Sequence, residues 1–175
     1  MLMKPPLRKL ALTAHVICSV GWLGAVICSL GLALAGVLSP DPGVVRASYL
    51  ALDVVGWFVL VPLSVASLVT GVVQSLGTRW GLFRHYWVLV KLAMNLAAVL
   101  VLLLYTQTLG YLADLAASLP PAAGLSELRS SSPVFHSALA VILLVLATVL
   151  ALYKPKGLTR YGQRKQRKQR TFASV

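Results

Sequence analysis

The chain has 175 residues, of which 58% are hydrophobic and only 11% charged, and its formal net charge is +12. A water-soluble domain of this length exposes too large a share of its surface to hide so many apolar side chains, so the composition excludes that class. The positive charge does not indicate nucleic-acid binding, because half of the basic residues follow the last apolar segment, in 154–175. No Walker, zinc or nucleotide-binding motif is present, which argues against hydrolytic and ATP-driven chemistry.

Charged residues are missing from four long stretches of the chain. These stretches are 10–40, 54–78, 92–113 and 130–153. Each is long enough for a helix of about 20 residues to cross roughly 30 Å of hydrocarbon, and lipid offers backbone N–H and C=O groups no other partner. The sequence therefore predicts an all-α integral membrane four-helix bundle in a single domain, 1–153. Its helices are expected near 11–38, 49–76, 86–112 and 133–153.

The first apolar stretch follows a basic start, as in a secretory signal, but it is about twice as long as a signal's apolar core. We therefore expect it to be a retained helix. Its two cysteines, Cys18 and Cys28, point in directions about 280° apart on a helix and are not expected to bridge each other. A homo-oligomer is compatible with the sequence, although no oligomer interface is legible in it.

The basic residues predict the topology, because Lys and Arg in short loops stay on the cytoplasmic side. Of the sixteen Lys and Arg residues, all but Arg46 and Arg129 fall on the side of the two termini. The acidic residues all fall on the other side: Asp41, Asp53, Asp114 and Glu127. We expect a bacterial inner (plasma) membrane protein with both termini in the cytoplasm (N-in/C-in). The basic tail 154–175 is expected to be mobile and attracted to anionic lipid headgroups, by about 1 kcal/mol per cation.

Polar residues inside the membrane cost free energy, so each of them is a candidate functional residue. His15, Ser19 and Trp22 share one face of the first helix, and Lys91 and Asn95 share a face of the third. The second and fourth helices add polar groups at the same depth: Thr70, Gln74 and Thr148. If these faces converge, the bundle holds a polar pocket that opens toward the cytoplasm. In the alternative, His15 caps a neighbouring carbonyl and Lys91 extends to the headgroups.

Two further histidines are candidate site residues. His85 lies at the interface and is expected to be a solvated loop residue. His136 begins the fourth helix on the external side, near the depth of Asp53 at the start of the second. These two could form an external metal or proton site, or they could be a capping aspartate beside an unrelated histidine.

Geometry limits how a cofactor could be held. His15 and His136 lie in opposite leaflets, roughly 20–25 Å apart, so they cannot ligate one haem iron. A second ligand for His15 must come from the inner layer, or the iron is five-coordinate. Copper is a competing occupant, because His15 and Cys18 share a face and Met94 lies at similar depth, which is a soft ligand set.

The stretch His15-Val-Ile-Cys-Ser-Val-Gly-Trp22 resembles the first helix of the small four-helix membrane protoporphyrinogen oxidases of the HemJ type. Pro62 with Gly71, the run Trp87-Val-Leu-Val-Lys91 and the pair Lys154-Pro155 are similar to later parts of that family. The histidine-to-tryptophan opening and the tryptophan-to-lysine helix also resemble copper-resistance membrane proteins of the CopD type. The first resemblance implies haem b on His15, with Lys91 in the family's lysine position. The chain differs from the oxidases where it enters the fourth helix, with Ser-Ser-Pro-Val-Phe-His136.

Three functions remain open at this point. The first is a haem-b redox protein or oxidase, a membrane oxidoreductase. Its cofactor pocket would take His15 as iron ligand, Lys91 on a propionate or anionic substrate, and Asn95 and Trp22 beside them. It would exchange electrons with a lipid-soluble quinone or a tetrapyrrole. The second is a copper or small-solute transport component with His136 and Asp53 at its outer mouth. The third is a non-catalytic membrane partner or assembly factor whose polar groups fix helix register.

Overall fold

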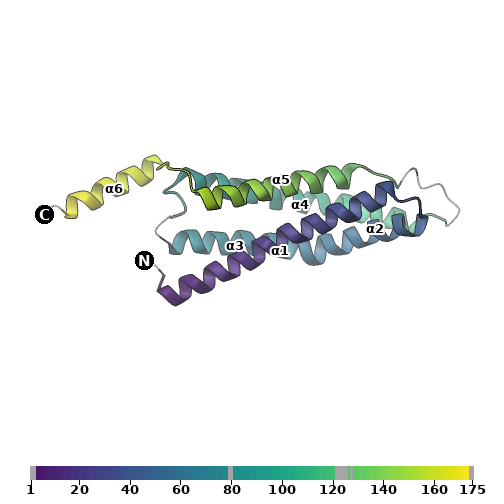
Figure 1. The fold of residues 1–175 in the computed structure, drawn as a ribbon, viewed down its shortest axis with the longest axis horizontal. Helices are drawn as coiled ribbons and strands as arrows, with labels where there is room; N and C mark the ends of the chain where they lie inside the picture. The colour runs from purple at the N-terminus through teal and green to yellow at the C-terminus, as the bar shows by residue number, and fades with distance from the viewer. Residues whose placement is uncertain (1–2, 79–80, 121–125, 127, 174–175) are drawn as a thin grey trace.

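A computed structural model describes residues 3–78, 81–120, 126 and 128–173. Helix α1 (Pro5–Leu38) is followed by one rod made of α2 (Pro42–Val55), the π-helical turn η1 (Gly56–Leu60) and α3 (Val61–Gly77). Helices α4 (Tyr86–Ser118) and α5 (Ser132–Tyr153) complete the bundle, and α6 (Arg160–Ala173) projects beyond it (Figure 1). Four spans, namely α1, the α2–η1–α3 rod, α4 and α5, are long and apolar enough to cross a membrane. The predicted all-α four-helix architecture is confirmed. Glu127, used above for the topology, lies outside the described residues.

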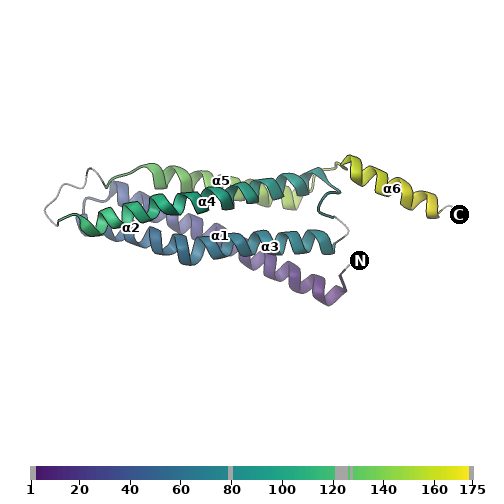
Figure 2. The same cartoon turned by 180° about the vertical axis from the view of Figure 1, so that it is seen from behind.

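Both termini lie at the same end of the bundle, as Figures 1 and 2 show from opposite sides. We call this the terminal end, and we call the opposite end, where α1 turns into α2, the loop end. An even number of spans produces this arrangement. The structure thus fixes that the two termini share a side, and the sequence-based charge pattern remains the basis for assigning that side.

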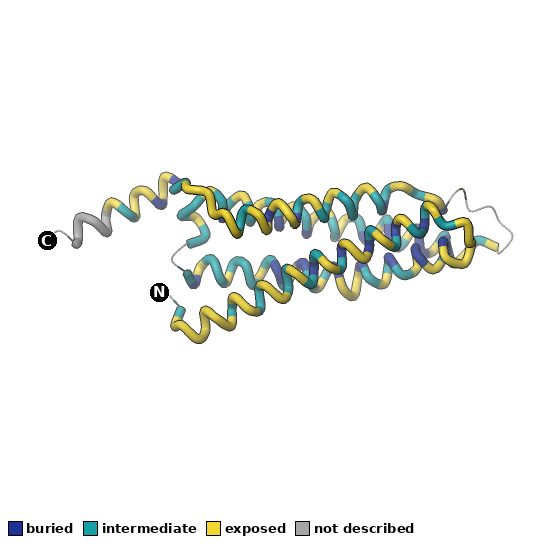
Figure 3. Tube along the Cα trace, viewed as in Figure 1, coloured by how far each residue is buried: buried dark blue, intermediate teal, exposed yellow. Residues whose placement is uncertain are grey.

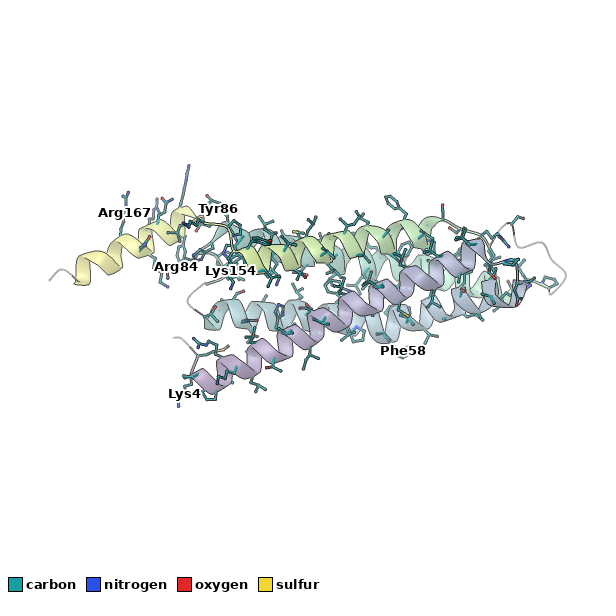
Figure 4. All side chains as sticks on the ribbon, viewed as in Figure 1. Lys4, Phe58, Arg84, Tyr86, Lys154 and Arg167 are labelled. Atoms are coloured by element: carbon teal, nitrogen blue, oxygen red, sulfur yellow. The ribbon has the colours of Figure 1, made fainter. Side chains whose placement is uncertain are left out.

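The helices surround a narrow interior in a fixed order. Helix α1 packs against α2, α3 and α5, and α4 packs against the same neighbours, whereas α1 and α4 do not pack on each other. They are therefore diagonal partners across the bundle. Buried residues follow the inward faces, and exposed residues face out along every helix (Figure 3). Many outward side chains are large and apolar, such as Phe58 at 78% exposure and Leu104 at 71%, and Figure 4 shows Phe58 pointing away from the bundle. Such a surface suits contact with lipid.

Most helix boundaries extend beyond the predicted ranges. The second span begins at Pro42, seven residues before the predicted start, because Asp41 caps it by accepting a bond from Gly43 N at 2.7 Å. Proline at the first helical position reinforces that start. The first span begins at Pro5 for the same conformational reason, and α4 continues to Ser118. Stretches without charged residues locate the apolar part of a helix, whereas capping residues determine where the helix begins and ends.

The α2–η1–α3 rod contains one wide turn that the sequence analysis did not predict. Pro62 has no N–H to donate to the carbonyl four residues before it. The chain ahead of it adopts a π-helical turn, in which the N–H of Val61 donates to the carbonyl of Gly56. This turn brings Gly56 against α4, where an added Cβ would lie 3.0 Å from Leu109. The turn thus lets the two helices approach closely at mid-bundle.

Two arginines at the loop end stabilise helix termini. Arg46 donates to the carbonyls of Ala116 at 3.0 Å and Pro120 at 2.6 Å, and also to that of Leu119, at the end of α4. Arg129 donates to the carbonyls of Val37 at 2.9 Å and Ser39 at 2.7 Å, at the end of α1. The last carbonyls of a helix have no partner within it and carry the negative end of its dipole. Both arginines therefore act as C-terminal caps as well as topology signals.

We expect Arg46→Ala to lower the free energy of unfolding by about 1–3 kcal/mol, because charged hydrogen bonds to three carbonyls are lost. Denaturation in mixed micelles, followed by circular dichroism, measures the change. Arg8→Ala is the matched control, because Arg8 is exposed at the terminal end. Its effect should stay within about 0.5 kcal/mol. Equal losses in the two variants would contradict the capping role.

The C-terminal segment is tied to the bundle where it begins. Thr159 N donates to the carbonyl of Arg84 at 3.1 Å, and Tyr86 N donates to that of Gly157 at 3.3 Å, which ties the segment to the α3–α4 loop. The Thr159 hydroxyl accepts from Gly162 N at 3.1 Å and so caps α6. Figure 4 shows Arg84, Tyr86 and Lys154 gathered where α6 leaves the bundle. The tail is helical over Arg160–Ala173, and its mobility stays a prediction.

Candidate functional site

His15 lies on α1 about 15 Å along the axis from the first residue of that helix. Its imidazole faces α3, where Nδ1 lies 3.1 Å from the hydroxyl oxygen of Thr70. Gly71 makes room for the ring, because an added Cβ there would lie 3.1 Å from His15 Cε1. Two neighbouring residues of α3 thus fix the imidazole, one by a hydrogen bond and one by having no side chain.

The hydrogen bonds of Thr70 assign the protonated nitrogen of this ring. The Thr70 hydroxyl donates to the carbonyl of Ala66 at 2.6 Å, with the carbonyl of Ser67 at 3.2 Å as a weaker acceptor. Its single proton is therefore used, and toward His15 the oxygen can only accept. Nδ1 of His15 must carry the proton, so in the neutral ring Nε2 carries the free lone pair.

Lys91 reaches that lone pair from the far side of the bundle. Its ammonium Nζ lies 3.4 Å from Nε2 of His15. Because α1 and α4 are diagonal and do not pack on each other, the two side chains meet in the bundle interior. Both are half-buried. The structure therefore brings together the two residues that the sequence placed in one layer.

No described carboxylate shares this depth with Lys91. Asp41 and Asp53 belong to the loop-end half of the second span. Asp114 follows Lys91 on the same helix by 23 residues, which is about 35 Å. The interior at the terminal end thus combines a nitrogen lone pair with a cation. Such a pair can bind a metal through the imidazole and an anion through the ammonium.

The other two predicted pocket residues lie nearby in different roles. Asn95 is buried, and its Nδ2 donates to the carbonyl of Lys91 at 2.9 Å, so its amide turns back onto its own helix. Trp22 is 2% exposed and packs in the mid-bundle apolar cluster with Val26 and Leu60. Asn95 supports the backbone that carries Lys91, and Trp22 forms the apolar layer beyond His15.

The polar layer has members from α1, α3 and α4, and not from α5. One turn beyond His15, the hydroxyls of Ser19 and Ser67 lie 2.9 Å apart and link α1 to α3. Thr148 of α5 is exposed and donates to the carbonyl of Leu144 on its own helix. The expectation that all four helices contribute was therefore wrong for α5, because its threonine faces outward.

His136 and Asp53 have separate neighbours. His136 Nδ1 lies 2.9 Å from the carbonyl of Ser132, and its ring stacks on Tyr105 at 4.0 Å between centroids. One carboxylate oxygen of Asp53 is buried without a hydrogen-bond partner, and it lies near Gly110 of α4. Within the described part of the chain no hydrogen bond or ion pair joins the two residues. An external site that uses both stays a prediction without geometric support.

Among the residues that the structure describes, no cluster of three or more His, Cys, Asp or Glu side chains could hold a metal ion. Cys18 is half-buried and forms no disulfide. The copper set of His15, Cys18 and Met94 gains no support from this geometry.

No family model, curated protein or solved structure matches this chain. The resemblance to HemJ-type oxidases and CopD-type copper proteins therefore stays a prediction.

Sequence reasoning did not anticipate two features. The first is the role of Thr70 and Gly71 in setting the imidazole, although Thr70 was placed at the right depth. The second is Tyr105, whose hydroxyl lies 3.0 Å from that of Ser132 while its ring stacks on His136. A tyrosine within a long apolar helix was a signal for it, because a phenol shielded from water needs a polar partner.

Proposed function

We propose that this chain is a haem-b-binding redox protein of a bacterial plasma membrane, a membrane oxidoreductase with its cofactor at His15. One observation carries the proposal: the lone pair of His15 Nε2 faces the bundle interior and meets Lys91 there at 3.4 Å. A histidine that only caps a backbone carbonyl would not need a partner from the diagonal helix.

The surroundings of His15 suit an iron ligand. Histidines that bind metals almost always donate their other ring N–H to a fixed acceptor, which sets the tautomer and the ring orientation. Thr70 supplies that acceptor at 3.1 Å, and Gly71 allows the ring to approach α3. Bound haem would supply one-electron transfer, at a potential set by its ligands and by burial.

Lys91 supplies the complementary charge. With haem held on Nε2 of His15, that lone pair would no longer be available to the ammonium, so Lys91 would be free to bind another partner. Because the described carboxylates lie in the other half of the bundle, that partner would be a haem propionate or an anionic substrate.

The charge distribution supports the proposed orientation. All but two of the sixteen basic residues belong to the side of the termini, which would place both termini in the cytoplasm and His15 in the inner leaflet. The basic helix α6 would then lie near anionic headgroups of that leaflet. A lipid-soluble quinone or a tetrapyrrole is the redox partner that this depth would admit.

The test is an absorption spectrum of protein purified after expression with ample haem. We expect a Soret band, and a shift of that band on reduction by dithionite. A colourless sample whose circular dichroism shows a folded helical protein would end the haem proposal. That outcome would favour a protein without a cofactor, such as an assembly partner.

We expect Thr70→Val to weaken haem binding by about 10- to 100-fold, because loss of a partner to a ligating histidine has effects of this size. Titration of apoprotein with haemin measures the affinity. Ser75→Ala is the matched control, since the Ser75 hydroxyl bonds only the carbonyl of Gly71 on its own helix. Equal affinities for the Thr70→Val variant and the wild type would show that Thr70 does not position His15.

A further inference from the structure

A cavity of about 150 Å³ lies in the bundle, distinct from the meeting point of His15 and Lys91. Its walls come from α1, α2, η1, α4 and α5, and they are almost entirely apolar, with Trp22 and Leu60 among them. Ala97 and Val101 of α4 and Leu139 of α5 belong to the lining and are also exposed on the outer surface of the bundle. The cavity therefore opens sideways between α4 and α5, toward lipid.

One end of this cavity is polar. His136 lines it and stacks on Tyr105, which lines it as well, with 4.0 Å between the ring centroids and 19° between their planes. The carbonyl of Ser132 lies 2.9 Å from Nδ1 of His136, and a carbonyl only accepts, so Nδ1 carries the proton. In the neutral ring Nε2 is then an acceptor, and no described residue bonds it. A ligand that bonds Nε2 of His136 must donate the hydrogen bond.

We infer that this cavity binds the ring of a lipid-soluble hydroquinone, whose hydroxyl donates to Nε2 of His136. The volume fits one aromatic ring, since an apolar cavity of about 150 Å³ takes benzene. The lateral opening admits a molecule dissolved in the bilayer, with its alkyl tail left among the lipids. The lining has no carboxylate, which disfavours a cation, and the free acceptor selects the reduced, hydroxyl-bearing form over the quinone.

The cavity and the proposed haem site adjoin through one side chain. Trp22, at the inner wall of the cavity, follows His15 by seven residues on α1, about 10 Å along the axis. This offset places the ring of a hydroquinone held here next to the layer that would hold the haem. That link rests on the proposed function, whereas binding of the ring rests on the cavity alone.

Isothermal titration of the purified protein in lipid nanodiscs tests the inference. The probes are 2-decylhydroquinone and 2-decyl-1,4-dimethoxybenzene, which has the same ring and tail but no hydroxyl proton. We expect the hydroquinone to bind about tenfold more tightly, the difference that one hydrogen bond of about 1.4 kcal/mol makes. The two probes binding equally to the wild type would overturn the inference.

Two variants locate the site. His136→Phe keeps a ring on Tyr105 and removes the acceptor, so it should bind both probes with the weaker affinity of the ether. Ala140→Phe fills the cavity from α5 and should reduce binding of both probes at least tenfold. Ala140→Leu is the milder variant, to be used if the larger side chain prevents folding. Unchanged preference in His136→Phe, or unchanged affinity in a folded Ala140 variant, would place the ligand elsewhere and overturn the inference.

A third variant separates this inference from the haem proposal. His15→Ala removes the proposed iron ligand and leaves the cavity lining intact. We expect it to bind 2-decylhydroquinone with wild-type affinity. Wild-type protein that is colourless yet prefers the hydroquinone would reject the haem and retain the cavity. A Soret band with no preference between the probes would reject the cavity assignment and retain the haem.

Discussion

His15→Ala is expected to abolish the Soret absorbance of protein purified after expression with haem, whereas His136→Ala should retain it. His15 Nε2 is the nitrogen that faces Lys91 in the interior, and His136 stacks on Tyr105 in the other half of the bundle. One iron cannot reach both residues. The measurement is the ratio of Soret absorbance to protein absorbance at 280 nm, which should fall at least tenfold in His15→Ala alone.

Circular dichroism must show that both variants are folded, because a misfolded protein also loses haem. Lys91→Met extends the test. It keeps most of the side-chain volume and removes the charge, so we expect weaker haem retention with the Soret band still present. Loss of the band in His136→Ala with its retention in His15→Ala would move the iron to the loop-end half and contradict the proposed site.

Tyr49→Ala is expected to produce the largest loss of stability in the bundle, about 3–5 kcal/mol, because a fully buried aromatic ring leaves a cavity. Tyr49 is 1% exposed, and its ring packs so closely on α1 that a Cβ at Gly36 would lie 3.1 Å from it. Its hydroxyl also accepts from Ser130 N at 3.0 Å and donates to the carbonyl of Ser130 at 3.3 Å. Tyr49 thus joins α2, α1 and the segment before α5.

Tyr49→Phe separates packing from hydrogen bonding, because it removes only the hydroxyl, and it should lower the free energy of unfolding by about 1–2 kcal/mol. Tyr111→Ala is the control, since Tyr111 is 66% exposed, and its effect should stay within about 0.5 kcal/mol. Unfolding in mixed micelles measures all three. A loss in Tyr49→Ala no larger than in Tyr111→Ala would contradict the loop-end packing described above.

The spans were predictable because hydrocarbon excludes charge, and the chain shows this in uninterrupted apolar stretches. The ends of the spans were less predictable, because they depend on local caps. Asp41 accepts from Gly43 N and starts the second span at Pro42, and Arg46 stabilises the far end of α4. The π-helical turn before Pro62 also depends on tertiary fit, since Gly56 must approach Leu109.

For the C-terminal segment, the prediction from the sequence was limited by a different cause. Its composition, rich in Lys, Arg and Gln, indicates a segment without a core of its own, and on that basis it was expected to be mobile. The order at its start comes from backbone bonds to the α3–α4 loop, through Thr159 and Gly157. Pairing of that kind depends on the path of the chain and leaves little trace in residue types.

In the candidate site, the sequence predicted how deep each polar side chain lies in the membrane, but not which neighbour it faces. The meeting of His15 and Lys91 follows from two helices that present polar groups at one level of a narrow bundle. The tautomer of His15 depends on the Thr70 hydroxyl being used by the carbonyl of Ala66, which only coordinates show. His136 and Asp53 were paired in the prediction because they lie at a similar depth. The fold does not join them, because each faces a different neighbour.

The central claim is that Nε2 of His15 occupies an iron coordination position, and chemical rescue tests it most directly. His15→Gly removes the imidazole and leaves a space of its size beside Gly71 and Thr70. Added imidazole should restore the Soret band of this variant, with half-recovery at millimolar concentration, and should not do so for the filled variant His15→Leu. A folded His15→Gly protein that keeps its full Soret band without imidazole would contradict the claim, and so would one that imidazole does not restore.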